Sequence, residues 1–136
     1  MKLFMNKKKQ YAQDNKDWLA VKAEEEGVQA LPGGVYYKVL ETGKGGNHPT
    51  PNDVIVAHYT GKTIDGKTFD SSRGGTPLAV HLRDLIPGWV IAMQQMRPGD
   101  RWEMYIPAEL GYGKYAQSGI PAHSTLIFDV ELISVH

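Results

Sequence analysis

Residues 85–106 have the sequence LIPGWVIAMQQMRPGDRWEMYI, which changes from a helical pattern to a strand pattern. Pro87 suits the first turn of a helix, where a backbone N–H would have no partner in any case. The apolar side chains that follow are spaced as on one helical face: Trp89, Met93 and Met96. Pro98-Gly99 ends the helical pattern, and residues 101–106 are typical of a strand. This stretch therefore predicts one short helix followed directly by a strand.

The rest of the chain after residue 31 consists of short alternating runs separated by Gly, Pro, Asn and Asp. Such runs predict further strands near residues 35–41, 54–60 and 125–135, with a hairpin turn at Asp65-Gly66. The last strand places four apolar side chains on the side that we expect to face the core: Leu126, Phe128, Val130 and Leu132. One short helix cannot cover both faces of a sheet. We therefore predict an α+β fold, in which one antiparallel sheet curls around the helix and its other face is exposed to water.

Residues 1–30 differ in composition and are expected to form a helical extension before a domain at 31–136. Good helix formers dominate, and Gly27 is a predicted helix stop. Aromatic residues recur every seven positions along this extension: Phe4, Tyr11 and Trp18. This stripe fits three alternatives, which are a helix docked on its own domain, the seam of a homodimer, or an arm that binds clients.

Composition excludes several classes of function. Fifteen Lys and Arg balance fifteen Asp and Glu among the 136 residues, so no net field attracts nucleic acid or an anionic membrane. No run approaches the roughly 20 apolar residues of a membrane span or the pattern of a signal peptide, and we expect a cytoplasmic protein. Cysteine is absent and no two histidines have a ligand spacing, so no metal site is expected.

The glycine pairs at 45–46 and 74–75 lack the Lys-Ser/Thr sequel of a phosphate-binding loop, and no nucleophile–base pair is visible. Large apolar side chains beside turn signals are the notable feature instead. In order they lie in VAHYTGKTIDGKTFDSSRGGTP (56–77), LIPGWVIAMQQMRPGDRWEMYIPAELGYG (85–113) and GIPAHSTLIFDVELI (119–133). This ordered set resembles the FKBP-type peptidyl-prolyl cis-trans isomerases over residues 31–136. The helical extension is similar to the bacterial subgroup of macrophage infectivity potentiators.

The resemblance implies an antiparallel half-barrel with a shallow apolar pocket between its helix and its sheet. Trp89 would form the floor of this pocket, with aromatic walls and an aliphatic rim supplied by Tyr59, Phe69, Phe128, Leu85, Ile86 and Ile120. The Ile86 N–H and the Tyr112 hydroxyl would donate to carbonyls that flank the substrate proline. Asp70 would lie at the edge beside Tyr59 and near Arg73. Leu78 and Val80 stand where many relatives carry aromatic residues. The rim is therefore expected to be less aromatic and to bind bulky ligands less tightly.

The implied activity is cis-trans isomerisation of Xaa-Pro bonds in protein folding, without cofactor or metal. The catalytic set would be Asp70, Ile86, Tyr112 and Phe128. Proline-containing polypeptides are the expected substrates and macrolides the expected inhibitors. A second hypothesis is a proline-binding module or chaperone in which turnover is incidental. In a third hypothesis the main role belongs to the extension, which joins two chains into a dimer whose two pockets bind one client.

Overall fold

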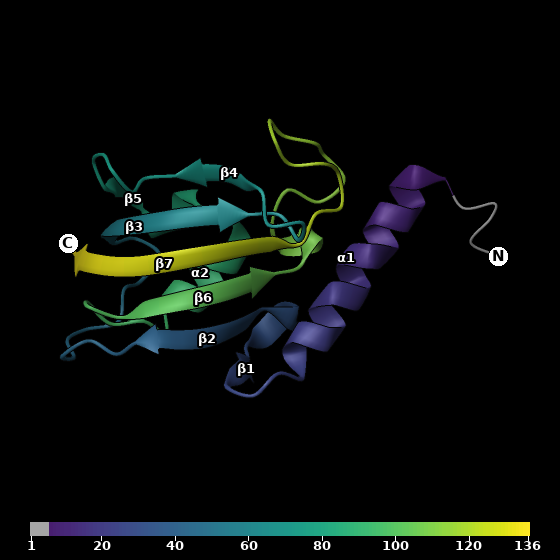
Figure 1. The fold of residues 1–136 in the computed structure, drawn as a ribbon. Coiled ribbons are helices and arrows are strands. Elements are labelled where there is room, and N and C mark those ends of the chain that lie inside the picture. Colours follow the sequence, from purple (N-terminus) through teal and green to yellow (C-terminus); the bar gives the residue numbers. More distant parts are fainter. Residues whose placement is uncertain (1–5) are drawn as a thin grey trace.

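The computed structural model describes residues 6–136, which form two helices, seven strands and three short 3₁₀ turns (Figure 1). The helices are α1 (Lys7–Ala23) and α2 (Pro87–Met93). The strands are β1 (Val28–Ala30), β2 (Tyr36–Glu41), β3 (Val54–Lys62), β4 (Thr68–Ser71), β5 (Leu78–His81), β6 (Arg101–Ile106) and β7 (Leu126–Val135). The 3₁₀ turns are Pro32–Gly34, Leu82–Asp84 and Ala108–Leu110.

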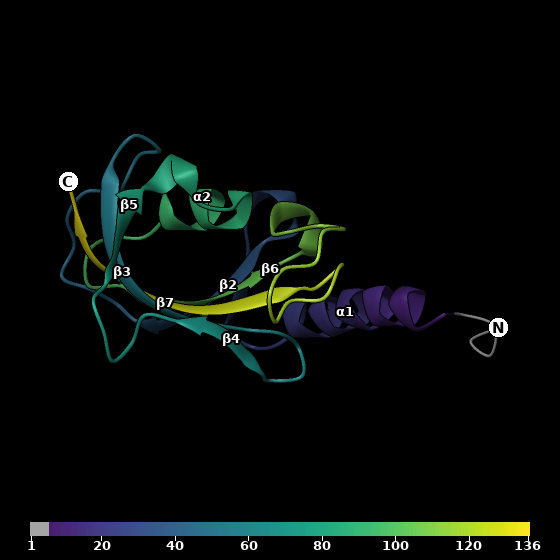
Figure 2. The same ribbon diagram turned by 90° about the horizontal axis from the view of Figure 1, so that it is seen from above.

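All seven strands belong to one antiparallel sheet, in which six strands follow the order β1-β2-β6-β7-β3-β4 and β5 pairs with β3 outside this path. Strand β3 pairs with β7 along one edge, while its other edge is shared by β5 over residues 54–57 and β4 over residues 60–62. Figure 2 shows the sheet curving around α2, which lies on its concave side. The predicted α+β fold, with an antiparallel sheet wrapped around a short helix, is confirmed.

The core lies between α2 and the concave face of the sheet. The four predicted inward side chains of β7 are all buried there. Close approach of α2 to β6 depends on Gly88, because a Cβ at this position would lie 2.5 Å from Ile106 Cγ2. The glycine thus lets the helix backbone touch the sheet and brings the neighbouring Trp89 side chain down onto the core.

The N-terminal extension differs from the prediction at its end. The Asn6 side chain accepts a hydrogen bond from the Lys9 N–H, which caps the start of α1. The helix ends at Ala23, and residues 28–30 form a strand that pairs with β2 instead of continuing the helix. Gly27 has a φ of 85°, so it allows the reversal that brings β1 onto the sheet. The sheet therefore begins before the predicted domain boundary at residue 31.

Helix α1 docks on its own domain, as the first of the three alternatives predicts. The Trp18 ring lies 6.0 Å from the Tyr105 ring, centroid to centroid, and the Tyr11 hydroxyl is 2.8 Å from Ser124 Oγ. Phe4, the first member of the predicted stripe, lies outside the described residues. Tyr105 is on the face of the sheet that points away from α2, yet it is only 1% exposed. The prediction that this face is exposed to water is therefore wrong where α1 crosses it.

None of the helices in residues 6–136 combines the length and the apolar character needed to span a bilayer.

Candidate functional site

An apolar cavity of about 180 Å³ opens between α2 and the sheet. Its walls come from β3, β4, β5, β7, the start of α2 and the loop that follows β6. The lining residues are Tyr59, Phe69, Asp70, Leu78, Leu85, Ile86, Trp89, Tyr112 and Phe128. Eight of these nine have aromatic or aliphatic side chains, and the ninth, Asp70, supplies the one carboxylate.

Phe128 is the centre of the aromatic wall. Its ring lies 5.2 Å from Trp89, 5.5 Å from Phe69 and 6.3 Å from Tyr59, centroid to centroid. The contacts with Trp89 and Phe69 are close to perpendicular, at 83° and 90°, which is a favoured arrangement for aromatic pairs. Trp89 and Phe128 are 3% and 4% exposed. The cavity surface is therefore continuous with the packed core and is held rigidly by it.

Sequence reasoning missed Gly61, which the aromatic wall requires. It lies opposite Phe128 in the register of β3 with β7. A Cβ at Gly61 would be 2.5 Å from Phe69 Cζ and 2.7 Å from Phe128 Cε1, so both rings occupy the space of the missing side chain. The signal was present, because a glycine inside a strand often marks a close approach of another group. The predicted strand stopped at residue 60, so Gly61 fell outside it.

Two hydrogen-bond donors lie at the cavity with no protein acceptor. Within residues 6–136, neither the Ile86 N–H nor the Tyr112 hydroxyl has a hydrogen-bond acceptor. Ile86 is the N-cap residue of α2, and the N–H of an N-cap residue has no acceptor inside its helix. Tyr112 is 36% exposed and stands on the loop after β6. Both predicted donors are therefore available to a ligand in an otherwise apolar cavity.

The carboxylate at the cavity edge is bound to a cavity tyrosine. The Tyr59 hydroxyl donates a 2.5 Å hydrogen bond to Asp70 Oδ2. Burial and the hydrogen bond to Asp70 raise the pKa of Tyr59 to about 12, so its hydroxyl stays protonated at neutral pH. The predicted pairing of Asp70 with Tyr59 is confirmed.

Arg73 does not join this pair. Its guanidinium donates to Asp129 Oδ1 at 2.9 Å and to Thr60 Oγ1 at 2.7 Å, on the face of the sheet away from α2. Arg73 therefore binds a carboxylate on the other face of the sheet and forms no ion pair with Asp70 among the described residues.

Ile120 is the one predicted rim residue that the structure does not place in the cavity lining. It is 4% exposed and belongs to the core cluster. Leu78, noted in the sequence as an aliphatic replacement on the rim, does line the cavity, whereas Val80 packs against the core without lining it. The other predicted binding residues converge as expected.

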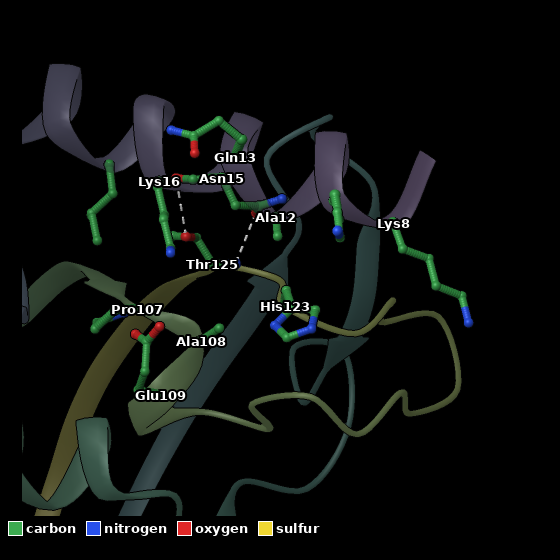
Figure 3. Close-up of a pocket in the computed structure, with 12 residues that line it drawn as sticks. Lys8, Ala12, Gln13, Asn15, Lys16, Pro107, Ala108, Glu109, His123 and Thr125 are labelled. Atoms are coloured by element: carbon green, nitrogen blue, oxygen red, sulfur yellow. Dashed lines mark hydrogen bonds between the residues drawn. The ribbon is translucent and has the colours of Figure 1, made fainter. Parts of the chain in front are cut away.

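A larger hollow of about 460 Å³ lies between α1 and the domain. Lysines of α1 line much of one side, and Pro107, Ala108, Glu109 and His123 lie opposite (Figure 3). It lacks the aromatic enclosure of the smaller cavity, which is therefore the better candidate site. Within the described part of the chain, no three His, Asp or Glu side chains are grouped so that they could share a metal ion.

Comparison with known proteins agrees with this geometry. A model of the FKBP-type peptidyl-prolyl cis-trans isomerases matches residues 45–133. The chain belongs to this family. The match includes every residue that lines the aromatic cavity.

Curated FKBP-type relatives match the chain over more of its length. The chain is 45% identical to FkpA of Escherichia coli over 114 residues, which are 83% of this chain and 42% of FkpA. It is 40% identical to the peptidyl-prolyl cis-trans isomerase Mip of Coxiella burnetii over 126 residues, which are 91% of this chain and 54% of that protein. The predicted resemblance to macrophage infectivity potentiators is confirmed. The chain spans about half the length of these relatives.

Solved FKBP-type structures have the same fold. The crystal structure of Escherichia coli FkpA superposes with a TM-score of 0.86 at 41% identity, over 93% of this chain and 59% of that one. A peptidyl-prolyl cis-trans isomerase from Pseudomonas syringae gives 0.87 at 30% identity, over 96% and 97% of the two chains. The second comparison includes nearly the whole of both chains.

Proposed function

We propose that this FKBP-type domain accelerates cis-trans rotation about Xaa-Pro bonds in polypeptides. The observation that carries the proposal is the apolar cavity with two donors, the Ile86 N–H and the Tyr112 hydroxyl, that have no acceptor within residues 6–136. A prolyl ring is apolar and has no N–H of its own, whereas the carbonyls around it need donors. The cavity offers both kinds of contact.

The barrier to rotation is roughly 18–20 kcal/mol, because the twisted amide loses its resonance. Water solvates the planar amide better than the less polar twisted form. Aromatic walls that replace this water raise the energy of the planar ground state relative to the twisted state. A barrier lower by about 7 kcal/mol corresponds to an acceleration of about 10⁵-fold.

The chain's own residues then orient the substrate. The Ile86 N–H and the Tyr112 hydroxyl hold the flanking carbonyls while the bond between them rotates. Tyr59 stays protonated at neutral pH and its hydroxyl is bound to Asp70. The mechanism needs no proton transfer, so Asp70 acts by holding Tyr59 at the cavity edge.

The lining also supports a preference among ligands. Leu78, Leu85 and Ile86 lie at the cavity beside the aromatic residues, which favours substrates with an apolar residue before proline. We propose that macrolide inhibitors enter the same cavity. Leu78 provides less contact area than an aromatic side chain, so a bulky macrolide is expected to bind less tightly than it does to relatives with an aromatic rim.

The direct test is NMR exchange of an Xaa-Leu-Pro-Phe peptide with wild type and Phe128→Ala. Truncating a buried Phe commonly costs about 3–5 kcal/mol of stability, so Phe128→Leu serves as a better-folded second variant. Tyr115→Ala is the control, because Tyr115 is 67% exposed and does not line the cavity. We expect acceleration by wild type and the control, and its loss in folded Phe128 variants. No acceleration by wild type would refute the proposal and favour the proline-binding module.

The cellular compartment and the oligomeric state of the protein remain predictions. A cytoplasmic location is tested by fractionation of the source cells. A homodimer through the predicted aromatic stripe is disfavoured, because Tyr11 and Trp18 already contact their own domain. Sedimentation equilibrium of the full chain tests it, and a mass of one chain would exclude the dimer.

A further inference from the structure

The loop between β6 and β7 carries Tyr112 near its start and is bonded to α1 at its end. Thr125 is the last loop residue before β7, and its N–H donates to Asn15 Oδ1 at 2.8 Å. Its hydroxyl also donates to the Asn15 carbonyl oxygen at 3.3 Å. Figure 3 shows both bonds joining α1 to the loop. One residue of the extension is therefore attached to the segment that leads back to the candidate site.

Asn15 is suited to this contact and poorly suited to helix formation. It is 1% exposed, although asparagine is disfavoured in the interior of helices. Its side-chain N–H donates to the Tyr11 carbonyl oxygen at 2.8 Å while its oxygen accepts from Thr125. Because a side-chain amide has both a donor and an acceptor, Asn15 forms the two bonds at once.

A second contact fixes the same end of the loop. The Tyr11 and Ser124 hydroxyls are 2.8 Å apart, and Ser124 donates to the Pro121 carbonyl oxygen at 2.6 Å. Tyr11 lies one helical turn before Asn15, so both side chains reach the loop from one face of α1.

Two further hydrogen bonds connect the end of the loop that α1 holds to Gly113, the residue after Tyr112. The His123 N–H donates to the Gly113 carbonyl oxygen at 2.8 Å, joining the outgoing and returning arms of the loop. His123 has a φ of 66°, which is unusual for a residue with a side chain. The Gly113 N–H in turn donates to the Ala108 carbonyl oxygen at 2.8 Å. The loop is thus held on one side by the turn after β6 and on the other by α1.

We propose that Asn15 is a positioning residue for the candidate site: by holding Thr125 it fixes the loop that places the Tyr112 hydroxyl at the cavity. This inference rests on the proposed isomerase function. It assigns the docked helix α1 a role in substrate orientation beyond covering part of the sheet.

A double-mutant cycle with Asn15→Ala and Tyr112→Phe tests the proposal on the full chain. In wild type, Asn15→Ala is expected to lower kcat/KM for the proline peptide by about threefold. In the Tyr112→Phe background the same change should have little further effect, because the hydroxyl it positions is gone. Equal fold losses in both backgrounds would overturn the proposal. Gln13→Ala is the matched control, since among the described residues its amide bonds only to Asp17 on the same helix.

Amide hydrogen exchange gives a readout that does not depend on turnover. The His123 N–H should exchange faster in Asn15→Ala than in Gln13→Ala, while the Val130 amide in β7 keeps its wild-type rate. Unchanged His123 exchange would also overturn the proposal. If wild type shows no isomerase activity, the proposed function fails, and this exchange result still decides whether α1 holds the loop. If Asn15→Ala does not fold, Asn15→Leu replaces it in both measurements, because leucine has a similar volume and favours helix formation but cannot form the amide bonds to Thr125 and Tyr11.

Discussion

Gly61 and Phe128 lie directly opposite each other on β3 and β7, and the Phe128 ring occupies the place of a side chain at Gly61. A Cβ there would lie 2.7 Å from Phe128 Cε1, closer than real Cβ contacts come. The aromatic wall of the cavity therefore depends on an absent side chain as well as on the rings. The register between β3 and β7 places these two residues opposite each other and so determines the shape of the site.

Gly61→Ala should displace the Phe69 and Phe128 rings. Overpacking of this kind typically costs about 1–3 kcal/mol, and we expect both a lower stability and a lower kcat/KM for a proline peptide. Denaturant unfolding and NMR exchange measure the two effects. Gly75→Ala is the control, because its nearest neighbour, Ser72 O, would lie at an ordinary contact distance of 3.6 Å. Wild-type activity in folded Gly61→Ala would contradict the role assigned to the wall.

Tyr112→Phe removes one of the two free donors and keeps the ring. The loss of one hydrogen bond of about 1 kcal/mol corresponds to about a fivefold decrease in kcat/KM. Stability should stay within about 0.5 kcal/mol of wild type, since the hydroxyl has no partner within residues 6–136. Peptide exchange and thermal unfolding check both expectations, and an unchanged kcat/KM would remove the hydroxyl from the mechanism.

Asp70→Leu should reduce activity more than Tyr112→Phe, by about tenfold or more, because it removes a charged hydrogen-bond acceptor at the cavity edge. It should also lower the pKa of Tyr59 from about 12, since the bond to Asp70 contributes to the raised value. Tyrosine-selective NMR titration measures this pKa. Tyr59→Phe is the companion variant. If Asp70 acts through Tyr59, the double variant should be no less active than either single one.

The face of the sheet away from α2 carries a separate charge cluster. Asp129 accepts hydrogen bonds from Arg73 and from Arg101, at 2.9 Å and 2.8 Å. Burial alone would raise the pKa of Asp129, but the hydrogen bonds and charges of the two arginines outweigh it and lower this pKa.

This lowered pKa predicts how stability depends on pH. The unfolded chain binds a proton at Asp129 more readily than the folded chain, so folding is weakened as acid is added. The contribution is fully present above the ordinary aspartate pKa of about 3.9 and is lost as the pH falls through the lowered folded value. Asp129→Asn should be less stable than wild type at pH 7, by about 1 kcal/mol for a partly exposed pair. It should also lose less stability between about pH 4 and pH 2, as measured by urea unfolding. Equal pH slopes would contradict the prediction.

Local sequence predicted much of this fold correctly. Proline at the start of α2, helical spacing of Trp89 and Met93, and alternation along β7 were sufficient, because each depends on neighbours a few residues away. The end of the helix was predicted wrongly, because the pattern continued through Met96 to Pro98-Gly99 whereas α2 ends at Met93. The resemblance to the family then placed Tyr59, Asp70, Ile86 and Tyr112 at one site, and the structure brings them together.

Other contacts depend on the tertiary structure, because they join residues that are far apart in the sequence. Arg73 binds Asp129, which is far along the chain, and Ile120 turns into the core instead of the cavity. Gly61 matters only because Phe69 and Phe128 fold over it, and buried Asn15 only because Thr125 lies beside α1. Periodicity determines which face a residue occupies. Which residue it contacts on that face depends on chain reversals and on sheet register. These bring distant residues within the few ångströms over which packing and hydrogen bonds act.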